Sequence, residues 1–149
     1  MLKTPYLDRI VSRETLNKIE KYCDFLIKYN KKLNLISKST ENIIMSRHIE
    51  DSSQLLKYIS SEDKNILDIG SGAGFPGIAM YIVKNDLNLD FKLDIVEKSS
   101  KKCTYLQGLC KFLEIDVVIH NHDVKNLEKK NYTTLVSRAF KPLDSFLHI

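Results

Sequence analysis

The segment between residues 66 and 77 reads ILDIGSGAGFPG and joins a short apolar run to a glycine-rich loop. The apolar run, residues 66–69, predicts a buried strand, and helical spacing of apolar residues begins at Ile78. Glycine at 70, 72, 74 and 77 permits positive φ and leaves room where a Cβ would collide with a ligand. A strand, a glycine loop and a helix in this order predict a site for a ligand that lies against bare backbone.

A carboxylate, Asp68, lies inside the predicted strand and bears on the choice of ligand. A pyrophosphate has no obvious use for an acid there, whereas a cationic or hydroxyl-rich ligand does. The residues from Gly72 to Gly77 nevertheless match the dinucleotide pattern G-x-G-x-x-G. The loop therefore favours a nucleoside-type cofactor, with a nicotinamide-dependent oxidoreductase or a tight turn without a ligand as alternatives.

After residue 64, apolar runs alternate with helical patterns, which is typical of a parallel sheet covered by helices. The predicted strands are 66–69, 91–96, 116–120 and 133–137, and the predicted helices are 77–83, 99–113 and a short one near Pro142. Two further helices are predicted before the sheet, over 12–30 and from Thr40 onwards. We expect an α/β fold with an N-terminal helical subdomain, residues 1–63, and a ligand-binding domain, residues 64–149.

The composition narrows the class of protein. With 43% hydrophobic and 28% charged residues, 149 residues can form one soluble domain with a core. The net charge of +4 permits an anionic partner without requiring one. No run approaches the roughly 18 apolar residues of a membrane span, and Cys23, Cys103 and Cys110 lack metal-ligand spacing. We expect a cytoplasmic protein with reduced thiols, no metal and no membrane contact, and the oligomeric state stays open.

The ends of the later strands supply candidate binding residues, because parallel sheets bind ligands at the carboxyl ends of their strands. Glu97 follows the second strand and can accept hydrogen bonds from both hydroxyls of a ribose. Asp123, Val124 and Lys125 follow the third strand, where an adenine would lie if the first loop holds the cofactor. Arg138 ends the fourth strand and can hold a carboxylate or phosphate, or stack on a base. For each of these, an ordinary loop or surface residue is the alternative.

A second group of candidates precedes the sheet or flanks its helices. His48 lies on an apolar face of the second predicted helix and Asp51 flanks that face, although a lone histidine there is more often a packing residue. Four lysines near helix ends can meet phosphates: Lys31, Lys32, Lys101 and Lys102. A solvated lysine-rich face is the alternative.

Four segments resemble, in order, the motifs of one family: YNKKLNL from Tyr29, RHIEDS from Arg47, LDIGSGAGFPG from Leu67 and SRAF from Ser137. The D-x-G-x-G-x-G part of the third is similar to motif I of class I S-adenosylmethionine-dependent methyltransferases. Together the segments resemble the ribosomal RNA small subunit methyltransferase G family, also called the glucose-inhibited division protein B family, over about residues 15–147. The resemblance implies a Rossmann-like sheet and methyl transfer from S-adenosylmethionine to guanine N7 in 16S ribosomal RNA of the small ribosomal subunit.

The residue patterns and the resemblance together predict roles for individual residues. The predicted cofactor-binding residues are Asp68, Gly70, Gly72, Gly74, Phe75, Glu97, Asp123, Val124, Lys125 and Arg138, and Arg138 is also the catalytic candidate. The predicted RNA-binding residues are His48, Asp51 and the four lysines. The loop after the third strand departs from the family, whose Arg-x-Glu pattern reads Asp123-Val124-Lys125 here.

The length of the chain is a second departure from the family. A class I methyltransferase sheet has seven strands, and only about a dozen residues follow the predicted fourth strand. We therefore expect strands one to four without strands five to seven. The hypothesis is a shortened guanine-N7 methyltransferase, and the alternative is a truncated, non-catalytic remnant that binds cofactor or RNA weakly.

Overall fold

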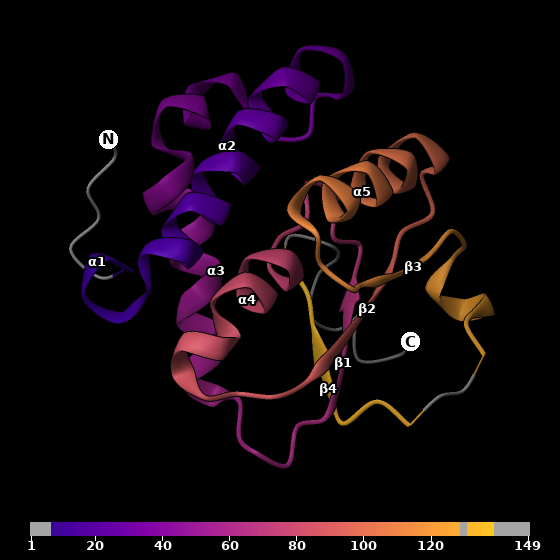
Figure 1. The fold of residues 1–149 in the computed structure, drawn as a ribbon. Helices are drawn as coiled ribbons and strands as arrows, with labels where there is room; N and C mark the ends of the chain where they lie inside the picture. Colours follow the sequence, from indigo (N-terminus) through magenta and orange to yellow (C-terminus); the bar gives the residue numbers. More distant parts are fainter. Residues whose placement is uncertain (1–6, 129–130, 139–149) are drawn as a thin grey trace.

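A four-stranded parallel sheet forms the centre of the computed structural model, which describes residues 7–128 and 131–138 (Figure 1). Its strands are β1 Asn65–Ile69, β2 Lys92–Val96, β3 Val118–His120 and β4 Thr134–Val136. They lie in the order β3-β2-β1-β4, and every neighbouring pair is parallel. The predicted α/β fold and its four strands are thus confirmed. The helix predicted near Pro142 lies outside the described residues.

Two helices connect the first three strands and cover one face of the sheet. They are α4, Gly77–Val83, and α5, Ser100–Leu113, and both lie on the side of the sheet toward α2 in Figure 1, here called the front face. Right-handed crossovers between successive parallel strands place both helices on the same face. The short 3-10 helix η4, Lys84–Leu87, continues α4. Ser99 caps α5 by accepting a hydrogen bond from the Lys102 backbone.

The longest helix, α2, spans Arg13–Leu33 and follows the short helix α1, Leu7–Ile10. Ser12 caps its start, and Asn34 in the left-handed conformation ends it. Its buried positions, which include Ile19, Tyr22 and Leu26, recur at helical spacing and pack against α4 and α5. The helix predicted over residues 12–30 is confirmed and extends by almost one further turn.

The segment after α2 is helical but irregular, whereas the sequence predicts one continuous helix from Thr40. It consists of η1 Lys38–Ile43 (3-10), η2 Met45–Glu50 (π), α3 Asp51–Ser53 and η3 Gln54–Tyr58 (3-10). Its buried residues lie four apart in two rows, 44-48-52-56 and 45-49-53. In an α-helix, positions four apart drift by about 40° per step. The wider π turn reduces this drift and keeps such residues on the core face.

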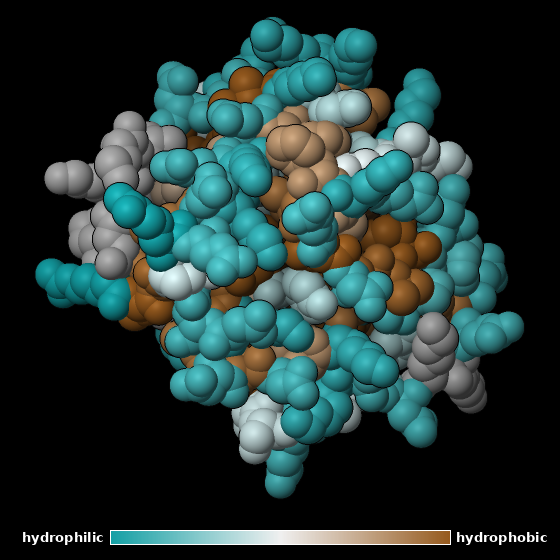
Figure 2. Space-filling model, in the orientation of Figure 1, coloured by the Kyte–Doolittle hydropathy of each residue, from teal (hydrophilic) through white to brown (hydrophobic). Residues whose placement is uncertain are grey.

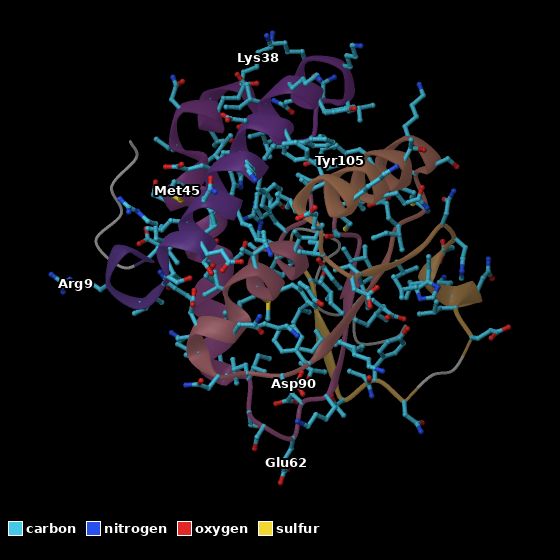
Figure 3. The ribbon with its side chains drawn as sticks, in the orientation of Figure 1. Arg9, Lys38, Met45, Glu62, Asp90 and Tyr105 are labelled. Carbon is cyan, nitrogen blue, oxygen red and sulfur yellow. The ribbon has the colours of Figure 1, made fainter. Side chains whose placement is uncertain are left out.

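One hydrophobic core joins the N-terminal helices to the front face of the sheet. It includes Ile19 and Ile49 from before residue 63 together with Ile78, Ile95 and Leu106 from beyond it. Figure 3 shows Tyr105 between α2 and α5, whereas hydrophilic side chains dominate the surface in Figure 2. The division into two domains at residue 63 stays a prediction. Residues from both sides of it belong to the same hydrophobic core. The three cysteines are free and buried.

The back face of the sheet has its own small cluster. Leu67, Ile69 and Val96 lie against side chains of the β3–β4 connection, namely Val124, Leu127 and Tyr132. That connection contains the short 3-10 helix η5, Val124–Asn126. Among the helices of the described ranges, none is long and apolar enough to cross a membrane.

Candidate functional site

The glycine loop is held against β1 by Asp68, whose side chain is fully buried. Asp68 Oδ2 accepts hydrogen bonds from Ser71 Oγ at 2.6 Å and from the Gly77 backbone at 2.8 Å. Burial raises the pKa of Asp68 to about 6, while these two hydrogen bonds oppose the shift. The acid that the sequence marks as unusual therefore fixes the two ends of the loop, and its contact with a ligand stays a prediction.

The glycines of the loop serve two different purposes. Gly70, Gly72 and Gly74 have φ of 70°, 60° and 104°, which residues with a Cβ rarely adopt. Gly77 has an ordinary φ, but a Cβ there would lie 2.6 Å from Asp68 Oδ2 and 2.9 Å from Asp68 Cβ. At Gly72 an added Cβ would meet only the Gly70 carbonyl, at 4.0 Å. The loop is thus packed tightly against Asp68 and is open at Gly72.

Two buried tyrosines hold the middle of the loop. Tyr22 from α2 and Tyr105 from α5 both donate their hydroxyl hydrogen to the Ala73 carbonyl, at 2.9 and 3.1 Å. Burial raises the pKa of both phenols, so they remain protonated donors. The sequence reading missed this pair. The available signal was a polar hydroxyl on the buried stripe of each helix, since a buried tyrosine normally finds a hydrogen-bond partner.

Glu97 lies directly after β2 and beside the glycine loop, as the sequence predicts. Its carboxylate accepts hydrogen bonds from the Gly72 backbone at 3.2 Å and from the Ser99 backbone at 2.9 Å. Each carboxylate oxygen has a second lone pair that can accept a further hydrogen bond. The backbone of Gly70 also joins this edge by donating to the Val96 carbonyl at 2.9 Å. The ends of β1 and β2 thus meet at one acidic, glycine-lined position.

Four residues that the sequence names separately meet at the end of β4. The Phe75 ring stacks on His48 with centroids 5.1 Å apart, and the Arg138 guanidinium lies 5.2 Å from the Phe75 centroid. Arg138 donates a hydrogen bond to His48 Nδ1 and lies 3.7 Å from an Asp51 carboxylate oxygen. The RHIEDS and SRAF segments therefore form one cluster with the glycine loop. Ala139 and Phe140 of the second segment lie outside the described residues.

His48 is buried and neutral in this cluster. Burial lowers its pKa to about 4, and the positive charges of Arg138 and Arg47 act in the same direction. Because arginine has only donors, His48 Nδ1 must accept, and its Nε2–H donates to Thr40 Oγ1 at 3.0 Å. Arg138 also has a lowered pKa through burial, but it stays charged. The sequence reading missed Thr40 as the second partner of the imidazole.

The loop after β3 places its three predicted residues differently. Asp123 is exposed and accepts a hydrogen bond from the Lys125 backbone at 3.0 Å, which caps η5. Val124 packs on the back-face cluster, and the Lys125 side chain is exposed. Their predicted contact with an adenine remains untested.

The four predicted RNA-binding lysines lie at two separate places. Lys31 and Lys32 are exposed in the last turn of α2, and Lys101 and Lys102 lie in the first turn of α5. His48 is only 7% exposed, whereas the Asp51 side chain is 57% exposed. RNA contact by all six residues stays a prediction. In the part of the chain that is described, no three His, Cys, Asp or Glu side chains are grouped to hold a metal.

The model of the rRNA small subunit methyltransferase G family matches residues 15–149. The chain belongs to this family. Its sequence is 37% identical over 133 residues to ribosomal RNA small subunit methyltransferase G of Cereibacter sphaeroides, covering 89% of this chain and 64% of the relative. It is likewise 37% identical over 142 residues to the protein of that name from Pelagibacter ubique, covering 93% and 66%. The chain therefore spans about two thirds of the length of these relatives.

A comparison of folds also finds methyltransferases. The structure is similar to an O-methyltransferase from Bacillus cereus, solved in complex with SAH, with a TM-score of 0.54 and 14% identity. The match covers 80% of this chain and 54% of that one. The Rossmann-like class I methyltransferase fold expected from the sequence is thus confirmed. Membership of the family disfavours the oxidoreductase alternative. A non-catalytic remnant would belong to the same family, so membership does not decide between it and an active enzyme.

Proposed function

We propose that this chain is an S-adenosylmethionine-dependent methyltransferase that acts on guanine N7 of 16S ribosomal RNA in the small ribosomal subunit. The observation that supports it best is the junction of the glycine loop with Glu97, where the Gly72 backbone and the carboxylate lie 3.2 Å apart. Family membership supports the RNA substrate and a cytoplasmic location. The choice of 16S RNA rests on the family resemblance.

The residues present fit the nucleoside part of this cofactor. Gly72 leaves open space above the loop, and the Glu97 carboxylate can accept two charge-assisted hydrogen bonds from a ribose. Asp123, Val124 and Lys125 would line the adenine side, and the loop from Gly70 to Phe75 would face the remainder of the cofactor. When bound, S-adenosylmethionine supplies an electrophilic methyl group on a sulfonium sulfur.

For this reaction the protein mainly has to position the two reactants. Guanine N7 has a free lone pair and no proton, so no general base is needed. Catalysis would therefore come from orientation of the two reactants and exclusion of water. Arg138 would orient the cofactor or the target base, because it lies at the end of β4 beside the glycine loop and its side chain is 32% exposed. Lys31, Lys32, Lys101 and Lys102 would supply contacts with RNA phosphates.

Calorimetric titration of the purified chain with S-adenosylmethionine and with SAH tests the cofactor assignment. We expect saturable binding of both, and a loss of about tenfold or more in affinity for Glu97→Gln, which keeps the shape of the side chain and removes its charge. Lys111→Gln in the last turn of α5 is the matched control and should bind normally. Heat at the level of buffer dilution for the unaltered chain would refute the assignment.

A further inference from the structure

The cluster at the end of β4 gives His48 a role that its sequence position alone does not suggest. His48 comes from the π-helical segment η2, Arg138 from the end of β4, and Phe75 from the glycine loop. The imidazole stacks on Phe75 with an angle of 17° between the rings, and its Nδ1 faces the guanidinium. The three segments are far apart in sequence, yet their side chains make one continuous contact.

The imidazole is held on both of its nitrogens. Thr40 accepts from Nε2 and in turn donates its hydroxyl to the Ser37 carbonyl at 2.9 Å. This arrangement fixes the tautomer, so Nδ1 is left as an acceptor aimed at Arg138. Asp51, from α3, forms an ion pair with the other terminal nitrogen of the guanidinium. An arginine side chain has many rotamers, and fixing it before a ligand arrives removes part of the entropy cost of binding.

We propose that His48 is a positioning residue that acts through Arg138, holding the guanidinium over Phe75 and toward the cofactor loop. The inference rests on the proposed function and deepens it, because Arg138 is the group that would meet cofactor or base. It replaces direct RNA contact by His48, whose side chain is buried. Asp51 supports the same geometry from the exposed side.

A double-mutant cycle of His48 and Arg138 tests the inference. His48→Phe keeps a flat ring on Phe75 but removes the acceptor, and His48→Asn keeps an acceptor close to the position of Nδ1. We expect His48→Phe to weaken SAH binding or to lower kcat for methylation of small ribosomal subunits by about tenfold. His48→Asn should recover most of that loss. In an Arg138→Ala background, His48→Phe should have less than about a twofold further effect.

Two controls separate positioning from a general loss of structure. Ile49→Val removes one methyl group from the core at the neighbouring residue and should lower the melting temperature without changing SAH affinity. Nitrogen NMR of the histidines measures the tautomer and the pKa of His48 and so tests its contact with Arg138 directly. In the unaltered chain His48 should be the Nε2–H tautomer, and in Arg138→Ala its pKa should rise toward the ordinary value of about 6.5.

The outcomes are distinguishable. If the unaltered chain binds no SAH, the proposed function fails and the inference fails with it. If it binds SAH but the effects of His48→Phe and Arg138→Ala simply multiply, the inference alone is overturned. If His48→Phe raises only the KM for RNA and leaves SAH affinity and kcat unchanged, His48 contacts RNA instead, which also overturns it.

Discussion

Asp68 and Gly77 show how a single backbone contact can set the shape of a ligand loop. The Gly77 backbone donates to Asp68 Oδ2, and the strand carboxylate approaches so closely that no Cβ fits between them. The absence of a side chain at Gly77 is therefore required by packing within the protein itself. Its replacement tests the packing of the loop against β1.

Gly77→Ala should destabilise the protein by about 1–3 kcal/mol, because the added methyl group would overlap Asp68, which the strand holds in place. Helix propensity alone would give the opposite sign, since alanine is favoured over glycine by about 1 kcal/mol. Gly108→Ala in α5 is the matched control, because its Cβ would lie at an ordinary 3.5 Å from Phe25. Urea unfolding should show Gly108→Ala as neutral or stabilised, and equal effects of both substitutions would contradict the packing described.

The low pKa of His48 has a consequence for stability against pH. Its pKa is about 4 in the folded state and about 6.5 when unfolded, so the unfolded chain binds the proton more tightly. Stability from this group is full above pH 6.5 and is lost as the pH falls toward 4, on the order of 3 kcal/mol in total. Asp68 has the opposite effect, because burial raises its pKa to about 6 and the folded chain binds the proton more tightly. Its contribution to the free energy of unfolding increases as the pH falls below 6.

Urea unfolding of the unaltered chain and of His48→Asn, measured between pH 7 and pH 4.5, isolates the histidine. The difference between the two free energies of unfolding should shrink or change sign in favour of the variant as the pH falls. Asp68 is present in both proteins, so its contribution cancels. A difference that is constant across this range would show that His48 has an ordinary pKa.

At the scale of elements, α2 and α5 together fix the glycine loop. Each supplies one tyrosine hydroxyl to the Ala73 carbonyl, so a helix from before the sheet and a helix within it meet at the site. The N-terminal helices thus contribute to the glycine loop as well as to the core. These two hydrogen bonds help to hold the loop in its positive-φ conformation.

Tyr22→Phe and Tyr105→Phe should each cost about 0.5–1.5 kcal/mol, because the Ala73 carbonyl keeps one donor in either variant. The double variant leaves that carbonyl unpaired and should cost more than the sum of the two. Denaturant unfolding of the four proteins measures this coupling. Strict additivity would mean that the two hydroxyls do not share one acceptor.

The sequence predicts elements with regular patterns well and predicts irregular ones poorly. Alternation of apolar runs and helices locates all four strands, α4 and α5, within one or two residues at most boundaries. The segment from Thr40 to Tyr58 is different, because apolar residues spaced by four predict an α-helix, whereas the segment is a series of 3-10, π and α turns. The sequence does not predict the contact of Arg138 with His48 and Phe75, because that contact depends on tertiary packing. Arg138 and His48 are 90 residues apart in the chain.

At the scale of the whole molecule, one core connects both parts of the chain. Tyr22, Leu26 and Ile49 from before residue 63 are fully buried in the same cluster as Ile78 and Leu106. The N-terminal helices would then be required for the fold and would not form a separable domain. The Arg138–His48 contact ties the end of the sheet to the same helices.

A fragment of residues 64–149 should therefore not fold cooperatively, because the front faces of α4 and α5 would lose the apolar surface of α2 and η2. Circular dichroism melting checks this against the full chain, whose transition should be cooperative and should rise when SAH is added. A sharp transition of the fragment would instead support two independent domains with a boundary at residue 63.

The proposed reaction is methyl transfer to guanine N7 in the RNA of the small ribosomal subunit. The direct measurement is transfer of labelled methyl groups from S-adenosylmethionine to small subunits purified from cells that lack the endogenous modification, followed by mapping of the modified base. We predict that label appears at guanine N7 in 16S RNA and that Glu97→Gln and Arg138→Ala each lower the rate by about tenfold or more. Label no greater than that of a reaction without protein would show that the chain does not catalyse this transfer.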